Sequence, residues 1–260
     1  MSKLALYCFT IYVYTLFLLF SAIGIPILTV FVTTLSLFIS NRSTMKRFRR
    51  AISWYGRLVT SIPFPFIKLC YEDRSNGETD GPYIFVSNHR SSTDAFLMCL
   101  LPYEAVQIVN TWPFHIPVLG FYARLSGYLN IKRMPPDLFF EKAGRLLQEK
   151  VSIIFFPEGT RSGGKQMGNF HGAAFRLALR SKIPIVPLCI SGNENIPPRG
   201  SVLLRPGTIR VRRLPAITWN EYKDLNAFSL KNRVREIISR ELQLMENGHT
   251  AECGTDAQKA

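Results

Sequence analysis

The chain has 260 residues, 47% of them hydrophobic, and carries 32 Lys and Arg against 18 Asp and Glu. This composition is typical of a globular chain and does not by itself indicate a polytopic membrane protein. The net charge of +14 favours a polyanionic partner, which could be anionic lipid, nucleic acid or an acidic substrate.

The first element is an uncharged apolar run from Leu4 to Ile39. It is longer than a bilayer span, which takes about 20 residues, and longer than a signal-peptide core of roughly 7–15 residues. Gly24 and Pro26 interrupt it, so it is either one tilted span or a helical hairpin that turns there. Residues 1–41 are therefore expected to form a hydrophobic helical membrane anchor.

A basic, aromatic segment follows the apolar run, and no Asp or Glu precedes Glu72. The positive-inside rule predicts a cytoplasmic position for its basic cluster, against anionic headgroups. Pro63 and Pro65 disfavour one regular helix over the second half. Residues 42–81 are expected to be an interfacial connector. Its basic cluster consists of Arg42, Lys46, Arg47, Arg49 and Arg50.

From residue 82 onward, short apolar runs alternate with segments of helical periodicity. The predicted strands are 83–86, 128–131, 151–156, 183–190 and 208–213, the last of them half-exposed. The predicted helices are 95–101, 138–150, 173–180 and an amphipathic one at 230–245. This alternation predicts an α/β domain over 82–245. Residues 246–260 lack aromatics and are expected to form a disordered tail.

The first polar cluster, Asn88–Asp94, comes directly after the strand predicted at 83–86. Within one helix, a spacing of five would place His89 and Asp94 about 140° apart, so they face each other only if His89 lies in the strand-to-helix turn. Asp94 would then lie near a helix N-terminus and could hold one imidazole nitrogen, leaving the other free as a general base. The alternative is a capping Asp beside an unrelated loop His.

The second polar cluster, Phe155–Ser162, also follows a buried strand. Gly159 permits a tight turn, and Arg161 offers a planar guanidinium suited to a phosphate. The sequence therefore predicts an anion site, the alternative being a surface turn with a solvated Arg. Cys and His residues are dispersed along the chain, so the sequence predicts neither a metal site nor a bound cofactor.

Four blocks of the sequence, in the order in which they occur along the chain, resemble those of the glycerolipid acyltransferase family, the PlsC-like enzymes. The most specific are Asn88–Asp94 (NHRSSTD) and Phe156–Ser162 (FPEGTRS). Gly127–Arg133 and Ile183–Leu188 resemble the family's two weaker blocks. The resemblance covers roughly Pro82–Ile217, and it implies a mixed sheet flanked by helices. Where many members have Phe-Lys-x-Gly after the third block, this chain has His171.

The resemblance implies a role for each matched residue. His89 would deprotonate the acceptor hydroxyl, and Asp94 would orient His89. Arg133 and Arg161 would bind the acceptor's phosphate. Three further residues are expected at this phosphate site: Glu158, Gly159 and Thr160. The residues expected at the acyl site are Ile185, Val186 and Pro187.

The implied reaction moves a fatty-acyl group from acyl-CoA or acyl-acyl carrier protein to the sn-2 hydroxyl of 1-acylglycerol-3-phosphate. The product would be phosphatidic acid, for phospholipid biosynthesis. The alternatives are another lysophospholipid or a lyso-aminolipid as acceptor, or a non-catalytic basic protein that binds anionic membranes. A catalytic domain on the cytoplasmic face of the cell (inner) membrane is expected, with no nucleic-acid partner.

Overall fold

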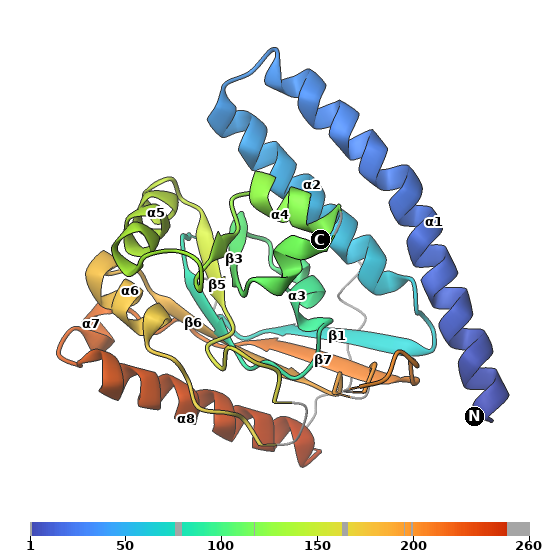
Figure 1. The fold of residues 1–260 in the computed structure, drawn as a ribbon. Helices are drawn as coiled ribbons and strands as arrows, with labels where there is room; N and C mark the ends of the chain where they lie inside the picture. The colour runs from blue at the N-terminus through green and yellow to red at the C-terminus, as the bar shows by residue number, and fades with distance from the viewer. Residues whose placement is uncertain are drawn as a thin grey trace.

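The computed structural model describes residues 2–75, 80–116, 118–162, 166–194, 196–198 and 200–248. Its centre is a seven-stranded mixed sheet in the order β1-β7-β6-β2-β5-β3-β4 (Figure 1). The sheet and its covering helices confirm the predicted mixed α/β class. The strands are β1 Ile67–Asp73, β2 Ile84–Ser87, β3 Ala105–Val109, β4 Leu129–Asn130, β5 Ser152–Phe155, β6 Ile185–Ser191 and β7 Gly207–Arg213.

Five neighbouring strands of the sheet are parallel. β2 pairs in parallel with β5 on one side and with β6 on the other, and β3 extends this set between β5 and β4. β7 pairs antiparallel with β6, and β1 pairs in parallel with β7. The carboxyl ends of β6, β2 and β5 therefore meet at one edge of the sheet, with β2 in the middle.

Helices cover both faces of the sheet (Figure 1). One face carries α5, α6, α7 and α8, and the other carries α1 to α4. The helices are α1 Lys3–Ser36, α2 Asn41–Ser61, α3 Asp94–Leu97, α4 Leu119–Leu125, α5 Pro136–Gln148, α6 Ala173–Ser181, α7 Trp219–Tyr222 and α8 Ala227–Glu246. Two 3-10 turns add Met98–Leu100 and Trp112–His115.

The core has two parts because successive side chains of a strand point to opposite faces. Ile84 and Val86 of β2 join the cluster under α5, α6 and α8, whereas Phe85 between them joins the cluster under α1 and α3. The amphipathic face predicted for α8 is the buried one, since Leu230, Val234 and other residues at helical spacing have little or no exposure. The tail expected after this helix lies, from residue 249 onward, outside the described residues.

The apolar run forms one continuous helix, α1, rather than a hairpin that turns at Gly24. Its 34 residues extend about 51 Å at 1.5 Å per residue, and Pro26 lies inside it. The chain returns through α2, which pairs with α1 along its length (Figure 1). The segment expected to be a connector therefore contains α2 and the edge strand β1, and the sheet begins before residue 82.

The strand β7 differs from its predicted half-exposed pattern. Arg212 and Arg213 are each only 1% exposed. Arg212 donates to Glu72 of β1 at 2.7 Å and to Glu241 of α8 at 2.5 Å, and Arg213 pairs with Asp73 at 3.1 Å. Arg212 and Arg213 are buried because carboxylates from two neighbouring elements meet them, whereas Arg210 of the same strand is half-buried.

Gly56 of α2 is expected to tolerate no side chain, because an added Cβ would overlap Sγ of Cys99 and approach its Cβ to 2.7 Å. Overpacking of this kind costs typically about 1–3 kcal/mol. Gly144 of α5 has nothing within 4 Å of the same position, so Ala there stabilises the helix by about 0.5–1 kcal/mol. Denaturant unfolding of Gly56→Ala and Gly144→Ala should show changes of opposite sign in the free energy of unfolding. Equal changes in the two variants would contradict the close approach of Gly56 to Cys99.

Candidate active site

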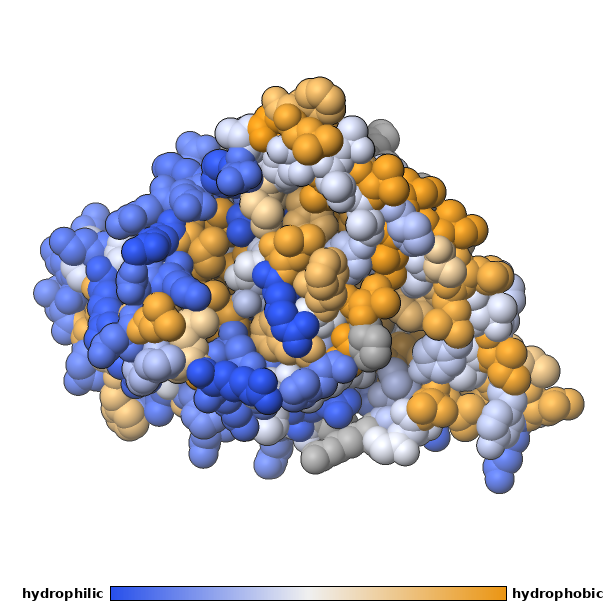
Figure 2. Space-filling model, turned by 45° about the horizontal axis from the view of Figure 1, so that its top comes forward, coloured by the Kyte–Doolittle hydropathy of each residue, from blue (hydrophilic) through white to orange (hydrophobic). Residues whose placement is uncertain are grey.

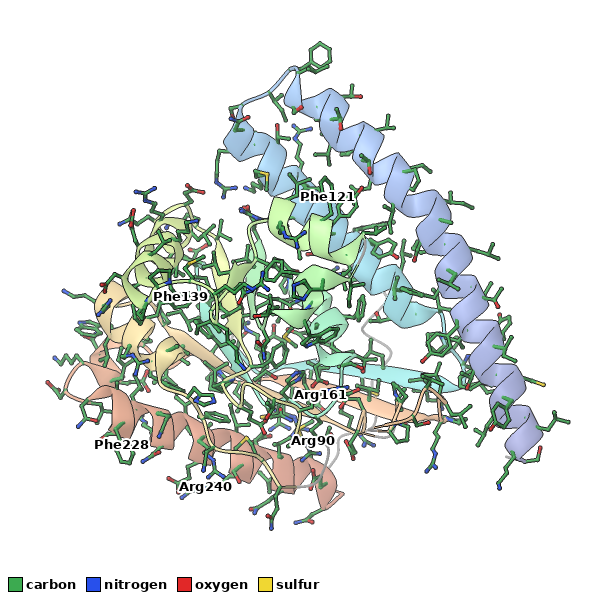
Figure 3. The ribbon with its side chains drawn as sticks, in the orientation of Figure 1. Arg90, Phe121, Phe139, Arg161, Phe228 and Arg240 are labelled. Carbon is green, nitrogen blue, oxygen red and sulfur yellow. The ribbon has the colours of Figure 1, made fainter. Side chains whose placement is uncertain are left out.

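The candidate site lies where the parallel strands β6, β2 and β5 end. In sheets of this kind, ligands bind outside the carboxyl ends of the strands. The loop after β2 carries His89 and Asp94, and the loop after β5 carries Glu158 and Arg161. The structure thus brings together the two clusters that the sequence placed after separate strands. Arg90 and Arg161, one from each loop, are labelled in Figure 3.

His89 and Asp94 form the predicted pair. His89 Nδ1 lies 2.7 Å from Asp94 Oδ2, with His89 in the turn after β2 and Asp94 at the first residue of α3. The His89 side chain is 20% exposed, whereas Asp94 is fully buried. With Nδ1 held by the carboxylate, the ring presents Nε2 as the nitrogen available to a substrate proton.

The Asp94 carboxylate is held by backbone as well as by His89. Its Oδ2 also accepts the N–H of Arg90 at 2.7 Å and the N–H of Ser91 at 2.9 Å. These donors come from the turn that precedes α3, so the loop closes on the carboxylate. Hydrogen bonds to an ionised acceptor are the strong kind, and they fix the carboxylate that orients the imidazole.

Glu158 braces the two loops against each other. Its Oε1 accepts the backbone N–H of His89 and its Oε2 that of Gly168, both at 2.7 Å. Burial raises the pKa of Glu158, although both backbone hydrogen bonds act in the opposite direction. The structure therefore places this carboxylate, 6% exposed, beneath the loops; its expected place at the phosphate stays a prediction.

Two further contacts fix the His89 backbone and ring. Ser162 donates its backbone N–H to the His89 carbonyl at 2.9 Å and its hydroxyl to the same oxygen at 3.2 Å. The ring of Phe156 lies 4.6 Å from the imidazole, centroid to centroid. The loop after β5 thus contacts the backbone of His89 through Glu158 and Ser162 and its ring through Phe156.

The residues expected to hold a phosphate lie at the open side of this loop. Gly159, Thr160 and Arg161 are all exposed. Gly159 adopts φ +67°, a conformation that L side chains rarely adopt, and an added Cβ would lie 3.0 Å from the His171 ring. His171 is exposed, and it donates its backbone N–H to the Pro157 carbonyl at 2.7 Å, so it lies in the wall of this loop.

Arg133 follows β4, at the same edge of the sheet. It is exposed, and its Nη2 lies 3.3 Å from Nε2 of His115. β4 is separated from β2 by two strands, which places it about 14 Å away at the usual strand spacing. Arg133 and His89 can therefore contact the same ligand only if that ligand extends across the ends of β5 and β3.

The predicted acyl-site residues lie inside β6. Ile185 and Val186 have no exposed surface, and Pro187 is buried beside Val86 of β2 in the sheet register. Ile185 belongs to the cluster on one face and Val186 to the cluster on the other. These residues build the sheet beneath the site, and their role toward an acyl chain stays a prediction.

Several residues that the structure brings to the site were not singled out by any sequence pattern. Ser162 and Phe156 belong to a recognised string but had no assigned role, and Gly168 lies in a loop with no local signal. Asn193, after β6, is 105 residues from Asn88 and fully buried. Asn193 lies shortly after the strand predicted at 183–190, but no pattern in the sequence names the residue.

The fold and site define an α/β enzyme with a His–Asp pair beside an exposed loop that carries Arg161. An acyltransferase family profile matches residues 68–191. The chain is 32% identical over 200 residues to a chloroplastic 1-acyl-sn-glycerol-3-phosphate acyltransferase of Brassica napus, covering 74% of this chain and 58% of that one. Its identity to one from Arabidopsis thaliana is 34% over 169 residues, covering 63% and 48%.

A crystal structure of the 1-acyl-sn-glycerophosphate acyltransferase PlsC from Thermotoga maritima has the same fold. The TM-score is 0.79 at 21% identity, and the match covers 96% of this chain and 100% of that one. The chain spans less than two thirds of the length of the curated relatives above. The domain that the profile matches, residues 68–191, belongs to the PlsC-like glycerolipid acyltransferase family.

Proposed function

We propose that this protein transfers a fatty-acyl group to the sn-2 hydroxyl of 1-acylglycerol-3-phosphate, giving phosphatidic acid. The observation that carries the proposal is the 2.7 Å contact between His89 Nδ1 and the buried Asp94 carboxylate. The acyltransferase profile spans the residues that hold this pair, and the plant relatives are named for this activity. The assignment to phospholipid biosynthesis follows from that product.

In the proposed mechanism, His89 Nε2 takes the proton of the acceptor hydroxyl as its oxygen attacks the thioester carbonyl. Asp94 stabilises the imidazolium that forms, because a carboxylate at Nδ1 favours the charged ring. The tetrahedral intermediate then collapses, the C–S bond breaks, and the thiolate receives the proton from His89. The ester product and the free thiol leave a neutral imidazole, so the residues of the site need no cofactor.

The acceptor phosphate is proposed to lie against the loop after β5. A phosphomonoester carries about −1.5 to −2 charges at neutral pH, which two arginines match. Arg161 precedes Ser162, whose hydroxyl donates to the His89 carbonyl. A phosphate bound to Arg161 would therefore hold the glycerol of the acceptor near Nε2 of His89. Arg133, across the edge, would complete the charge match, and Gly159 lets the Thr160 backbone approach an anion closely.

The donor is proposed to be acyl-CoA or acyl-acyl carrier protein. Both are thioesters with an anionic carrier, and the chain's net charge of +14 favours their approach. The same charge would attract an anionic membrane surface, and nucleic acid is not part of the proposal.

Membrane attachment is proposed to run through α1. Among the residues that the structure describes, α1 is the one helix long and apolar enough to cross a membrane. Figure 2 shows apolar residues gathered on the α1 side of the molecule, opposite a hydrophilic side. Phe121 of α4 extends this surface next to α2 (Figure 3).

The contacts of α1 favour a helix that lies along the membrane surface. Thr10 accepts the Leu204 N–H at 3.0 Å near one end, and Thr29 meets the hydroxyl of Tyr122 towards the other. A helix fastened to the same domain along its length cannot easily cross the bilayer without that domain. The proposed location is the cytoplasmic face of the cell inner membrane; an epitope at residue 1 reachable from the opposite face would overturn this orientation.

The proposed function is tested with an acceptor panel. Purified protein in detergent should acylate 1-acylglycerol-3-phosphate, with either acyl-CoA or acyl-acyl carrier protein, and mass spectrometry should find phosphatidic acid. Glycerol-3-phosphate, lysophospholipids with larger headgroups and a lyso-aminolipid complete the panel. Faster acylation of any of these would reassign the acceptor, and no transfer to any acceptor would leave only a membrane-binding role.

Arg161→Ala is expected to raise the KM for 1-acylglycerol-3-phosphate about 10- to 100-fold with a smaller effect on the KM for the donor. Charge-assisted hydrogen bonds to a phosphate are each worth about 1.5–3 kcal/mol, which corresponds to this range. Arg240→Ala is the matched control, because Arg240 is equally an exposed arginine but lies on α8 (Figure 3). An unchanged acceptor KM in Arg161→Ala would remove Arg161 from the phosphate site.

A further inference from the structure

The Asp94 carboxylate has a partner on each oxygen. Oδ2 is shared by the His89 ring and two backbone N–H groups, as described above. Oδ1 accepts a hydrogen bond from the side-chain amide of Asn193. Asn193 is fully buried, so this bond is shielded from water. A buried carboxylate whose second oxygen lacked such a donor would be strongly destabilised.

Asn193 reaches Asp94 because β6 runs beside β2. The two strands are parallel, and Asn88, the residue after β2, clamps their ends together. Its side-chain amide donates to the Ile190 carbonyl at 2.9 Å, and its Oδ1 accepts the Ile190 N–H at 2.8 Å. Gly192 then turns the chain at φ +85°. The residue that follows this turn is therefore delivered to the carboxylate that His89 faces.

The amide is oriented by the carboxylate rather than by its own surroundings. An ionised carboxylate only accepts hydrogen bonds, so the NH2 group must face Asp94. Within the part of the chain that the structure describes, the buried Oδ1 of Asn193 has no hydrogen-bond partner. Buried polar atoms are nearly always paired, and leaving one unpaired is costly. The unpaired oxygen is explained if the role of Asn193 is to donate an N–H to Asp94.

We propose that Asn193 is a positioning residue for the acyl-transfer site, the third member of a His89–Asp94–Asn193 relay of hydrogen bonds that joins the adjacent ends of β2 and β6. The proposal rests on the proposed function, in which His89 is the base. Asn193 acts through Asp94 and not on the substrate itself. It fixes the rotation of the Asp94 carboxylate, so that Oδ2 keeps facing Nδ1 while the imidazole gains and loses its proton.

The first consequence concerns the kinetic split. Asn193→Ala removes the donor to Oδ1 and is expected to lower kcat about 10- to 100-fold, the range for one hydrogen bond to a charged group. The KM for the acceptor should change less than about threefold, because the phosphate contacts of the other loop are untouched. Asn232→Ala on α8, which alters an exposed asparagine, is the matched control and should leave both constants unchanged.

The second consequence concerns pH. Asn193→Asp keeps the shape of the side chain but places two carboxylates in contact, and such a pair retains one proton to an unusually high pH. While the introduced carboxyl group holds that proton, it donates to Asp94 as the amide does. Activity relative to wild type is therefore expected to be highest at low pH and to fall as pH rises and both groups ionise.

Other charged groups around this pair are the same in variant and wild type. His89 faces Asp94 from the turn after β2, and Glu158 lies close enough for Asp94 to raise its pKa. Glu194 accepts the Gly192 N–H at 3.1 Å and faces Arg90 at 3.6 Å. A difference in pH profile between the two proteins therefore reports on position 193.

The deciding experiment combines steady-state kinetics across pH with NMR of the His89 ring in the full-length protein in detergent. The Nδ1 proton of an imidazole held by a carboxylate resonates far downfield, and its absence in His89→Ala assigns it. We expect this signal to shift or broaden in Asn193→Ala and to depend on pH in Asn193→Asp. Wild-type kcat in Asn193→Ala, together with a wild-type pH profile in Asn193→Asp, would overturn the proposal.

Two controls separate the possible failures. If Asn193→Ala does not fold, Asn193→Asp, which keeps the size of the side chain, still decides through its pH profile. If wild-type protein transfers no acyl group, the proposed function fails. The NMR signal then still shows whether Asn193 orients the Asp94–His89 pair, since that measurement needs no turnover.

Discussion

His89→Ala is expected to lower kcat for acyl transfer about 10³-fold or more, the upper part of the range for a positioned general base. The variant removes both the proton acceptor and the ring that Asp94 holds at 2.7 Å. The fold should survive, because the His89 side chain is partly exposed and the Glu158 and Ser162 contacts that hold this loop use its backbone. The measurement is single-turnover transfer of a labelled acyl group, with binding of the acceptor followed separately.

His171→Ala is the comparison for this variant. It removes a second imidazole from the same edge of the sheet, one that packs against Gly159. We expect kcat to fall less than about tenfold there, because the ring lies in the loop wall and not against Asp94. Equal losses of kcat in the two variants would mean that His89 supports the structure of the site rather than acting as the base. Full activity in His89→Ala would contradict the proposed mechanism.

Local patterns in the sequence predicted the elements that hold the site. Buried runs predicted β2 and β5, and the polar strings after them carry His89, Asp94 and Arg161. The parallel pairing of those two strands, which the structure shows, brings the strings together. The general-base pair could be predicted because His89 and Asp94 both lie in the polar string after β2, so its geometry is local to one strand end.

Other features depend on contacts between distant parts of the chain, and the sequence could not supply them. Pro63 and Pro65 do prevent one regular helix, since α2 ends at Ser61, but no sequence pattern predicted the helix before them, which packs against α1. The strand β7 looked half-exposed because basic and apolar residues alternate in it, but carboxylates of β1 and α8 pair with Arg212 and Arg213 and bury them. Periodicity reports which residues are polar, not whether a distant group will pair with them.

Asn193 illustrates the same limit at the site itself. Asparagine after a strand is ordinary turn chemistry, and nothing local distinguishes it from a surface turn. Its position is decided by the order of strands, by the Asn88 clamp on Ile190 and by the turn at Gly192. A sequence shows each of these residues, but only the fold shows that they converge on one carboxylate.

The turn at Gly192 leads to the second large expected effect. An added Cβ at Gly192 would overlap the carbonyl oxygen of Thr208 in β7, and the residue also adopts φ +85°. Gly192→Ala therefore combines backbone strain of about 1–2 kcal/mol with overpacking of about 1–3 kcal/mol. We expect unfolding in denaturant to show a loss of about 3.5 kcal/mol, the middle of the summed range, and kcat to fall because Asn193 moves with the turn.

Gly200→Ala separates the two causes. Gly200 adopts φ +78°, nearly the same strained conformation, but an added Cβ there has nothing within 4 Å. Its loss of stability should thus be the strain alone, about 1–2 kcal/mol, with kcat unchanged. The difference between the variants measures the contact of the turn with β7. If Gly192→Ala lost no more than Gly200→Ala, the backbone of β7 would not define this turn, and the route by which β6 delivers Asn193 to Asp94 would have to be reconsidered.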